Sequence, residues 1–176
     1  MKKFLVVIVG WSGAGKTALA HELAKKHDFA NIGEDSFVFD MNPKSLIKRV
    51  ARVADRKIGT ENMLLVLNNY MKNQKSIVVE GALVDGPIYL RDFEKIAEKN
   101  NYDFVPIMII ADEKIRRARK KKKIYNYVIP RKLDKRLIES AKLLKYDEIS
   151  HVIDTTNLSM KKSLLLIEKI LNHKCY

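Results

Sequence analysis

The stretch that decides the fold of this chain is Gly10-Trp11-Ser12-Gly13-Ala14-Gly15-Lys16-Thr17. It matches the pattern G-x-x-x-x-G-K-S/T and stands between an apolar run, Phe4–Val9, and an amphipathic segment, Thr17–His27. A strand, a glycine-rich turn and a helix in this order form a phosphate-binding loop, because the backbone N–H groups of the turn and the helix N-terminus both favour an anion. An ordinary glycine-rich turn is the alternative, and the flanking strand and helix argue against it. The stretch therefore predicts binding of a nucleoside triphosphate.

The last two residues of the loop have separate roles in this interpretation. Lys16 is placed to reach the β- and γ-phosphates, and Thr17 to offer its hydroxyl to Mg²⁺. The expected cofactors are therefore ATP and Mg²⁺. The residues expected to hold the nucleotide phosphates are Gly10, Ser12, Gly13, Ala14, Gly15, Lys16, Thr17 and Ala18.

Length and composition describe one globular domain. The chain has 176 residues, of which 47% are hydrophobic, which is enough for a buried core. No apolar run approaches the roughly 20 residues of a membrane span, and the short apolar run after Met1-Lys2-Lys3 is interpreted as a strand rather than a targeting segment. The single cysteine, Cys175, excludes an internal disulfide framework and a cysteine metal cluster, so a cytoplasmic location is expected.

The net charge of +13 favours anionic partners such as nucleotides, nucleic acid or acidic surfaces. A lysine-rich proteome is an equally good explanation of the same excess. The four histidines are scattered along the chain without metal-ligand spacing.

Strands alternate with helices along the whole chain, and Gly59-Thr60 is expected to break one helix into two. This alternation predicts an α/β protein: a three-layer α/β/α domain over residues 1–176, with a five-stranded parallel sheet and the P-loop NTPase fold. Pro106 is the one objection, because proline inside a strand is tolerated only near the strand's start or at a bulge. The expected strands after the first are 29–32, 76–80, 104–110 and 151–154, and the expected helices after the first begin near residues 43, 61, 88, 112 and 131 and after Ser159, the last with a buried stripe of Met160, Leu164, Ile167 and Leu171.

Acidic residues follow three of the expected strands. Ligands of parallel sheets bind beyond the carboxyl ends of the strands, where Asp35, Glu80 and Asp112 stand. Asp35 suits the base that orients an attacking hydroxyl, and Glu80 suits the metal side; both lie nearest the phosphate loop if their strands flank the first strand. Ordinary strand-end acids are the alternative for both, and Asp112 fits a helix N-cap better.

Arginines repeat at helical spacing in two places. Arg116 and Arg119 share one face of a basic helix, where a lid could grip the triphosphate and stabilise the charge in transit. Arg49, Arg52 and Arg56 share a face of the helix after the second strand and could hold an anionic acceptor. A solvated basic surface is the alternative for each set.

In this order of elements the chain resembles the P-loop small-molecule and nucleotide kinases, with uridine kinase and nicotinamide riboside kinase as the nearest examples. The resemblance rests on Asp35-Ser36-Phe37, on Val78-Val79-Glu80-Gly81 and on the arginine-rich segment Ile109–Arg119. It implies that Asp35 orients the substrate hydroxyl, that Glu80 lies near the metal and that arginines of a lid near 114–130 cover the phosphates. The catalytic residues implied are Lys16, Asp35, Arg116 and Arg119.

The segment Val152–Asn157 resembles kinases of the polynucleotide kinase and zeta toxin group, where the loop after the fifth strand lies beside the adenine. This resemblance implies that Thr155 and Asn157 lie near the adenine. The acceptor is expected to bind near residues 36–75. The residues expected to bind it are Asp35, Arg49, Arg52, Arg56 and Glu80.

The sequence thus predicts an enzyme that transfers the γ-phosphoryl group of ATP to a hydroxyl or phosphate of a nucleoside-like small molecule. A kinase acting on nucleic-acid ends is an alternative, because the basic residues would serve a polyanion. A nucleotide-dependent switch or non-catalytic binding module is disfavoured, since the third strand ends in Glu80-Gly81 and the chain has no N-K-x-D sequence. The acceptor and the oligomeric state are left open.

Overall fold

The structure is a computed structural model that describes residues 2–37, 53–81, 87–121 and 151–173. A five-stranded sheet forms its centre, with the strand order β2-β3-β1-β4-β5 and parallel pairing throughout. This confirms the predicted fold class. The strands are β1 (Phe4–Gly10), β2 (Ala30–Gly33), β3 (Ile77–Glu80), β4 (Asp103–Ile110) and β5 (His151–Asp154).

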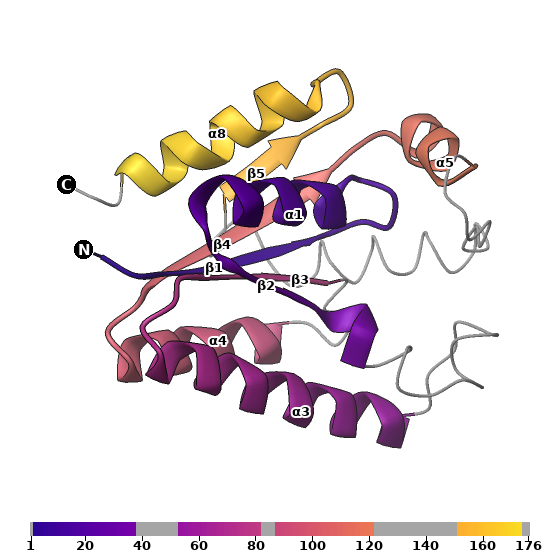
Figure 1. Cartoon of the computed structure of the whole chain (residues 1–176). Helices are drawn as coiled ribbons and strands as arrows, with labels where there is room; N and C mark the ends of the chain where they lie inside the picture. The colour runs from indigo at the N-terminus through magenta and orange to yellow at the C-terminus, as the bar shows by residue number, and fades with distance from the viewer. Residues whose placement is uncertain (1, 38–52, 82–86, 122–150, 174–176) are drawn as a thin grey trace.

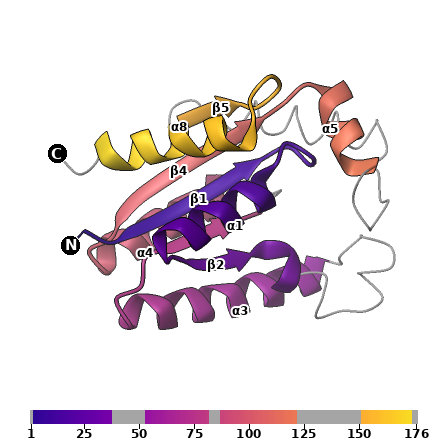
Figure 2. The ribbon, with the colours of Figure 1, turned by 45° about the horizontal axis from the view of Figure 1, so that its top comes forward.

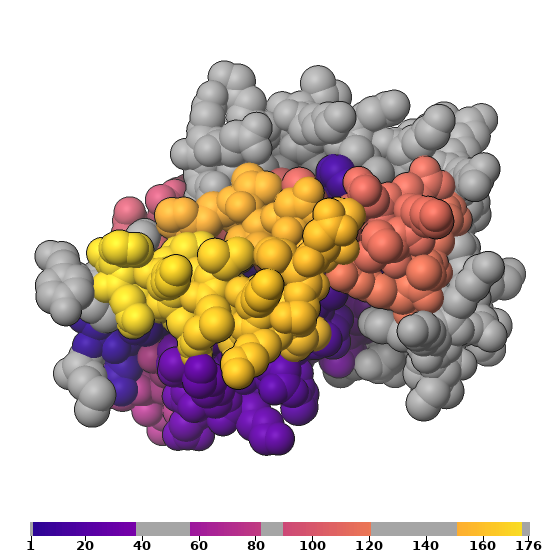
Figure 3. Space-filling model, turned by 90° about the horizontal axis from the view of Figure 1, so that it is seen from above, coloured from indigo at the N-terminus to yellow at the C-terminus, as the bar shows by residue number. Residues whose placement is uncertain are grey.

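Helices cover both faces of the sheet (Figure 1). On one face lie α1 (Lys16–His27) and α8 (Met160–His173), and on the other lie α3 (Val53–Lys72) and α4 (Pro87–Lys99). The short helix α5 (Glu113–Lys121) stands beyond the end of β4 (Figure 2). Seen from above, α1 lies along one side of α8, and α5 adjoins the segment leading into α8 at one end (Figure 3). Helices on both faces are what an all-parallel sheet requires.

The strand β1 lies in the middle of the sheet, and its residues Leu5–Val9 are all buried. Since alternate side chains of a strand point to opposite faces, this one apolar run contributes to two cores. One core joins Leu5, Val7 and Val9 to Met63, Leu67 and Met71 of α3 and to Leu90, Phe93 and Ala97 of α4. The other core joins Val6 and Ile8 to Leu19, Ala20 and Leu23 of α1 and to Ile167 and Leu171 of α8.

Within the described residues, no helix has the length and apolar character needed to cross a bilayer.

The predicted break at Gly59-Thr60 is wrong, because α3 runs through both residues. Glycine inside a helix costs about 1 kcal/mol relative to alanine. The buried side chains of Met63, Leu67 and Met71 outweigh this cost, since burying one such side chain stabilises a fold by about 1.5–3 kcal/mol. Tertiary packing therefore overrides the local preference. The start of the helix predicted from near residue 43 and the whole helix predicted over 131–145 lie outside the described residues, whereas the end of the former belongs to α3.

The strand order also differs from the arrangement in which the second and third strands flank the first. Here β3 and β4 flank β1, and β2 pairs only with β3 among the described strands. Consequently Glu80 at the end of β3 is next to the phosphate loop, whereas Asp35 follows a strand one position further away. Long-range pairing decides this order, and no local pattern encodes it.

Pro106 lies inside β4, opposite Val7, without disturbing the sheet. The N–H of Asp103 faces β1, because it donates to the Lys3 carbonyl (2.8 Å), whereas the Ile110 carbonyl faces β5 and accepts from Thr155. Backbone groups alternate sides along a strand, so the Pro106 nitrogen faces the β5 side. Among the described residues, pairing with β5 begins only at Ile107, so the missing N–H removes no hydrogen bond from the described part of the ladder.

The last helix begins as predicted, with the Lys162 N–H donating to the Ser159 hydroxyl (3.3 Å). Its predicted stripe is wrong at one position, since Met160 is 42% exposed. The buried face instead starts at Ser163, whose hydroxyl donates to the Ser159 carbonyl (3.1 Å) and so is paired inside the core. A serine at this place is invisible to a search for apolar residues.

Candidate active site

The loop between β1 and α1 has a backbone that only glycine adopts readily. The φ angles of Gly10, Gly13 and Gly15 are 136°, 84° and 111°. A Cβ on Gly10 would collide with the Ile109 carbonyl oxygen of β4, and one on Gly13 would lie 2.7 Å from the Arg116 carbonyl oxygen. The loop therefore passes directly against the end of β4 and the backbone of α5.

Hydrogen bonds within the loop, and from the loop to β4, fix its backbone. The Trp11 N–H donates to the Ile109 carbonyl (3.3 Å), and the Trp11 carbonyl accepts from the Ala14 N–H (3.0 Å) and from Lys16 Nζ (3.4 Å). The N-cap of α1 is Gly15, which has no side chain to occupy the first N–H groups of the helix, and no acidic residue stands in the first turn. These N–H groups and the helix dipole remain suited to a bound phosphate.

Thr17 and Glu80, which were both predicted to lie near a metal ion, are joined by a hydrogen bond. The Thr17 hydroxyl donates to Glu80 Oε2 (3.2 Å), because the pairing of β1 with β3 sets Glu80 opposite Ile8. Glu80 is only 7% exposed. A hydroxyl and a carboxylate are hard oxygen ligands, the kind that Mg²⁺ prefers. The described residues contain no cluster of three or more His, Cys, Asp or Glu side chains that could hold a metal, so an ion here would also need phosphate and water oxygens.

The acids after β2 point to a second part of the site. Asp35 is exposed, whereas its neighbour Glu34 is half-buried and lies so close to Gly81 that a Cβ there would collide with Glu34 Oε2. A Cβ on Gly33 would lie 3.2 Å from Glu80 Oε1, which is tight but no collision. The side chains of Glu34 and Glu80 therefore each lie against the end of the neighbouring strand. Sequence reasoning missed Glu34, although its position at a strand end, next to Asp35, is a signal that could have found it.

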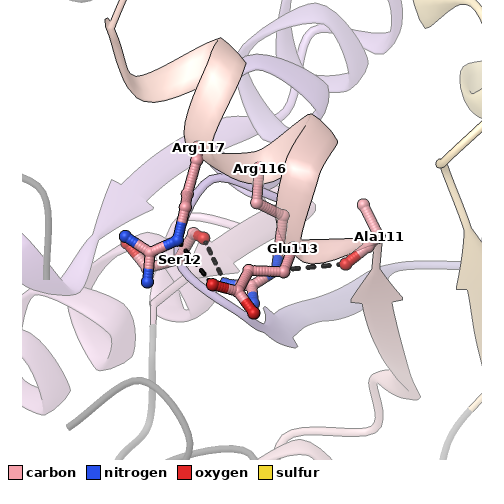
Figure 4. Close-up of polar contacts among 5 residues, drawn as sticks. All are labelled: Ser12, Ala111, Glu113, Arg116 and Arg117. Atoms are coloured by element: carbon pink, nitrogen blue, oxygen red, sulfur yellow. Dashed lines mark hydrogen bonds and ion pairs between the residues drawn. The ribbon is translucent and has the colours of Figure 1, made fainter. Parts of the chain in front are cut away.

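The two predicted lid arginines contact the backbone of the loop. Arg116 is 2% exposed; its Nε donates to the Ala111 carbonyl (3.0 Å) and its Nη1 to the Ser12 carbonyl (3.1 Å), as Figure 4 shows. Its guanidinium also lies 5.3 Å from the centre of the Trp11 ring, a cation–π distance. Sequence spacing did not reveal this burial, because arginine alone on a basic helix is usually solvated.

Arg119 and Thr155 fasten the next part of the loop. Arg119 Nη1 donates to the Ala14 carbonyl (3.1 Å) and to the Thr155 hydroxyl (3.0 Å), and that hydroxyl donates to the Ala14 carbonyl (2.9 Å). Thr155 is 3% exposed, whereas Asn157 is exposed at the same end of β5. The structure thus places Thr155 against the loop, and the predicted contacts of both residues with adenine stay predictions.

The loop after β5 is joined to the start of α5 by Thr156. Its hydroxyl accepts from the Asp112 N–H (2.9 Å) and donates to Asp154 Oδ1 (2.6 Å). Hydrogen bonds from the Thr156 hydroxyl and N–H hold the pKa of Asp154 below its ordinary value. The Asp112 carbonyl accepts the first helical N–H of α5, that of Arg116, which agrees with the expected cap position.

The remaining predicted site residues are placed only in part. Ala18 is exposed in the first turn of α1. Arg49 and Arg52 lie outside the described residues, and Arg56 belongs to α3 without a described side chain. The expectation that these three arginines bind an acceptor stays a prediction.

Comparisons with known proteins bear on the family and the fold. The model of a family described as "AAA domain" matches residues 5–143, and no curated protein matches the chain. A sugar kinase from Janibacter sp. HTCC2649 is similar in structure, with a TM-score of 0.73 and 18% identity over 97% of this chain and 95% of that one.

A shikimate kinase from Aquifex aeolicus vf5 has a TM-score of 0.65 and 13% identity over 98% of each chain. An APS kinase from Mycobacterium tuberculosis has a TM-score of 0.64 and 14% identity over 97% of this chain and 98% of that one. These similarities show a fold shared with kinases, and they give no support to the uridine kinase or nicotinamide riboside kinase branch. Because the family match extends over more than half of the sequence, the chain belongs to the AAA domain family, and its fold is that of the P-loop kinases.

Proposed function

We propose that this protein is a kinase that transfers the γ-phosphoryl group of ATP to a hydroxyl group of a small molecule. The observation that carries the proposal is the hydrogen bond between Thr17 and Glu80. It lies beside the phosphate loop, in which Lys16 Nζ donates to the Trp11 carbonyl. A triphosphate bound to the loop would have a cation, a hydroxyl and a buried carboxylate beside it. Positioning and electrostatic stabilisation of this kind are most of what phosphoryl transfer requires.

On the donor side, the loop N–H groups bind the β-phosphate, and Lys16 moves from the Trp11 carbonyl to the β- and γ-phosphates. Thr17 and Glu80 would hold Mg²⁺ through their hydroxyl and carboxylate oxygens. When bound, Mg²⁺ neutralises charge that develops on the phosphate oxygens. The buried position of Glu80 supports this assignment, since a buried carboxylate favours a nearby cation.

On the acceptor side, Asp35 orients the hydroxyl and accepts its proton. Its exposure at the end of β2 leaves it accessible to a molecule entering beside the loop. The similar structures are named for sugars, shikimate and APS, which favours a small hydroxylated acceptor over a nucleic-acid end. A nucleoside is one member of this broad class and has no particular support among those names.

The test is a transfer assay with γ-labelled ATP and Mg²⁺ against separate panels of sugars, sugar acids, shikimate, nucleosides and oligonucleotides. We expect label on one class of small molecule, and a loss of about 10³-fold in Lys16→Ala. The Lys16→Ala protein, purified in the same way, also measures any contaminating kinase. Label on no acceptor above the Lys16→Ala background would refute the proposal. Label on oligonucleotides alone would replace it with a kinase of nucleic-acid ends.

A further inference from the structure

Two peptide groups of the phosphate loop are held from the side opposite the proposed phosphate position. Arg116 Nη1 donates to the Ser12 carbonyl, and Arg119 Nη1 donates to the Ala14 carbonyl, both at 3.1 Å. The Thr155 hydroxyl adds a second bond to the Ala14 carbonyl (2.9 Å). Both arginines come from α5, so one helix fixes two alternate carbonyls of the loop.

Holding these carbonyls also fixes the N–H groups that follow them. In a planar trans peptide the C=O of one residue and the N–H of the next point in opposite directions, and the described residues contain no cis bond. A donor on the Ser12 carbonyl therefore turns the Gly13 N–H away from α5, and donors on the Ala14 carbonyl do the same for the Gly15 N–H. These two glycines have positive φ angles and no side chain to restrain them, so external contacts must set their orientation.

Arg116 has the contacts that such a role requires. Besides the Ser12 carbonyl, it donates to the Ala111 carbonyl at the end of β4, and its guanidinium lies against the Trp11 ring. With 2% exposure, the side chain is held between the loop and the body of the protein (Figure 4). A residue that gripped the γ-phosphate directly would instead present its guanidinium to the open side of the loop.

We propose that Arg116 is a positioning residue of the nucleotide site: it orients the Ser12–Gly13 peptide so that its N–H binds the β-phosphate, while Arg119 orients the Ala14–Gly15 peptide. It acts through the loop and makes no contact with the transferred phosphoryl group. This inference rests on the proposed function, since it assigns the loop to a nucleotide diphosphate or triphosphate. It replaces the lid role that the sequence resemblance implies for Arg116.

The experiment compares Arg116→Gln with Arg117→Gln in titrations of ADP and AMP. The two variants lose the same charge from adjacent residues of α5, but Arg117 donates to Glu113 (2.7 Å) rather than to the loop. We expect the ADP dissociation constant to rise about tenfold or more in Arg116→Gln and less than about twofold in Arg117→Gln. AMP has no β-phosphate, so its affinity should change little. Trp11 is the only tryptophan, so its fluorescence reports on the loop directly.

Steady-state kinetics separate positioning from direct contact. Once an acceptor has been identified, the Arg116→Gln variant should show a higher KM for ATP, raised in parallel with its ADP dissociation constant. Arg116→Lys should recover only a small part, because an ammonium group lacks the planar fork that reaches two carbonyls at once. A normal ADP affinity with a large fall in kcat would overturn the inference and restore a direct role. An equal loss of ADP and AMP affinity would overturn the inference, because it would indicate a general destabilisation of the nucleotide site.

Arg119→Gln supplies a second test if Arg116→Gln does not fold. It should weaken ADP more than AMP through the Ala14–Gly15 peptide, and unchanged ADP affinity would refute the scheme for both arginines. The wild-type titration separates the two proposals. A wild type that binds neither ADP nor ATP would refute the proposed function together with this inference, whereas a wild type that binds ADP and an Arg116→Gln variant that binds it equally would refute the inference alone.

Discussion

The loop after β1 and the ends of β2 and β3 lie at the same edge of the sheet but are built differently. At the loop, backbone meets backbone, as where Gly10 lies against the Ile109 carbonyl of β4. At the ends of β2 and β3, backbone meets the ends of side chains, as where Gly33 lies against the Glu80 carboxylate. The first arrangement permits one geometry, whereas the second can adjust to a change of side chain. A fixed phosphate side and an adaptable acceptor side would let one fold serve different small-molecule substrates.

The largest effect is expected from Gly10→Ala, which tests this comparison directly. A Cβ would collide with backbone at a φ of 136°, so we expect a loss of about 3 kcal/mol or more in the free energy of unfolding. Gly33→Ala is the matched control. Its Cβ would lie 3.2 Å from the Glu80 carboxylate oxygen, at the end of a side chain, so its loss should stay below about 1 kcal/mol. Urea unfolding measures both, and equal losses would contradict the contrast between the two regions.

Asp35→Asn should lower kcat by about 10²-fold while leaving ADP affinity within about twofold, because the amide cannot accept the proton of the acceptor. Steady-state kinetics and an ADP titration check the two halves of this prediction. Glu98→Gln, which changes an exposed acid of α4, is the control and should leave both quantities unchanged. If ADP affinity falls as steeply as kcat, Asp35 belongs to the phosphate side instead.

Glu80→Gln should raise the Mg²⁺ concentration for half-maximal activity by about tenfold, since outer ligands commonly contribute this much to metal binding. The glutamine oxygen can still accept from the Thr17 hydroxyl, so the variant removes charge rather than the hydrogen bond seen at 3.2 Å. ADP binding without Mg²⁺ provides the control and should not weaken. An unchanged Mg²⁺ dependence would remove Glu80 from the metal side.

The smallest effect concerns Glu168, which lies outside both regions and joins α8 to α1. It accepts from Lys26 (2.6 Å) and lies 2.7 Å from His27 Nε2. The hydrogen bond from Lys26 is the main cause that holds the pKa of Glu168 below its ordinary value, while burial opposes it. A lowered pKa means that the carboxylate stabilises the fold above the ordinary glutamate pKa of about 4.3.

Glu168→Gln should therefore unfold more easily than the wild type at neutral pH, by about 1 kcal/mol. The difference should shrink as the pH falls through the lowered pKa of Glu168, because the wild-type carboxylate is then protonated as well. Urea unfolding from neutral to acidic pH measures it, with ADP affinity at neutral pH as the control for an intact site. A difference that does not depend on pH would show that packing, not charge, joins the two helices.

Much of the fold could be predicted from the sequence because its signals are local. The alternation of apolar runs with amphipathic segments gives the strands and the helices, and the ends of β1, α1 and β5 agree with it to within a residue. The position of Glu80 beside the phosphate loop was also expected, since the loop and a strand-end acid meet at one edge of a parallel sheet. The break at Gly59 failed because packing against the sheet outweighed a local helix preference.

By itself, the sequence determined that a phosphate loop joins a buried strand to a helix, because glycine spacing, lysine and threonine act within a few residues of one another. Only the tertiary structure decided that β3 lies between β1 and β2, which separates Asp35 from the loop by one strand. It also decided that Arg116 is buried behind the loop rather than exposed over it. Both depend on contacts between residues far apart in the chain, such as Ser12 and Arg116, and helical spacing is the same for a buried arginine as for a solvated one.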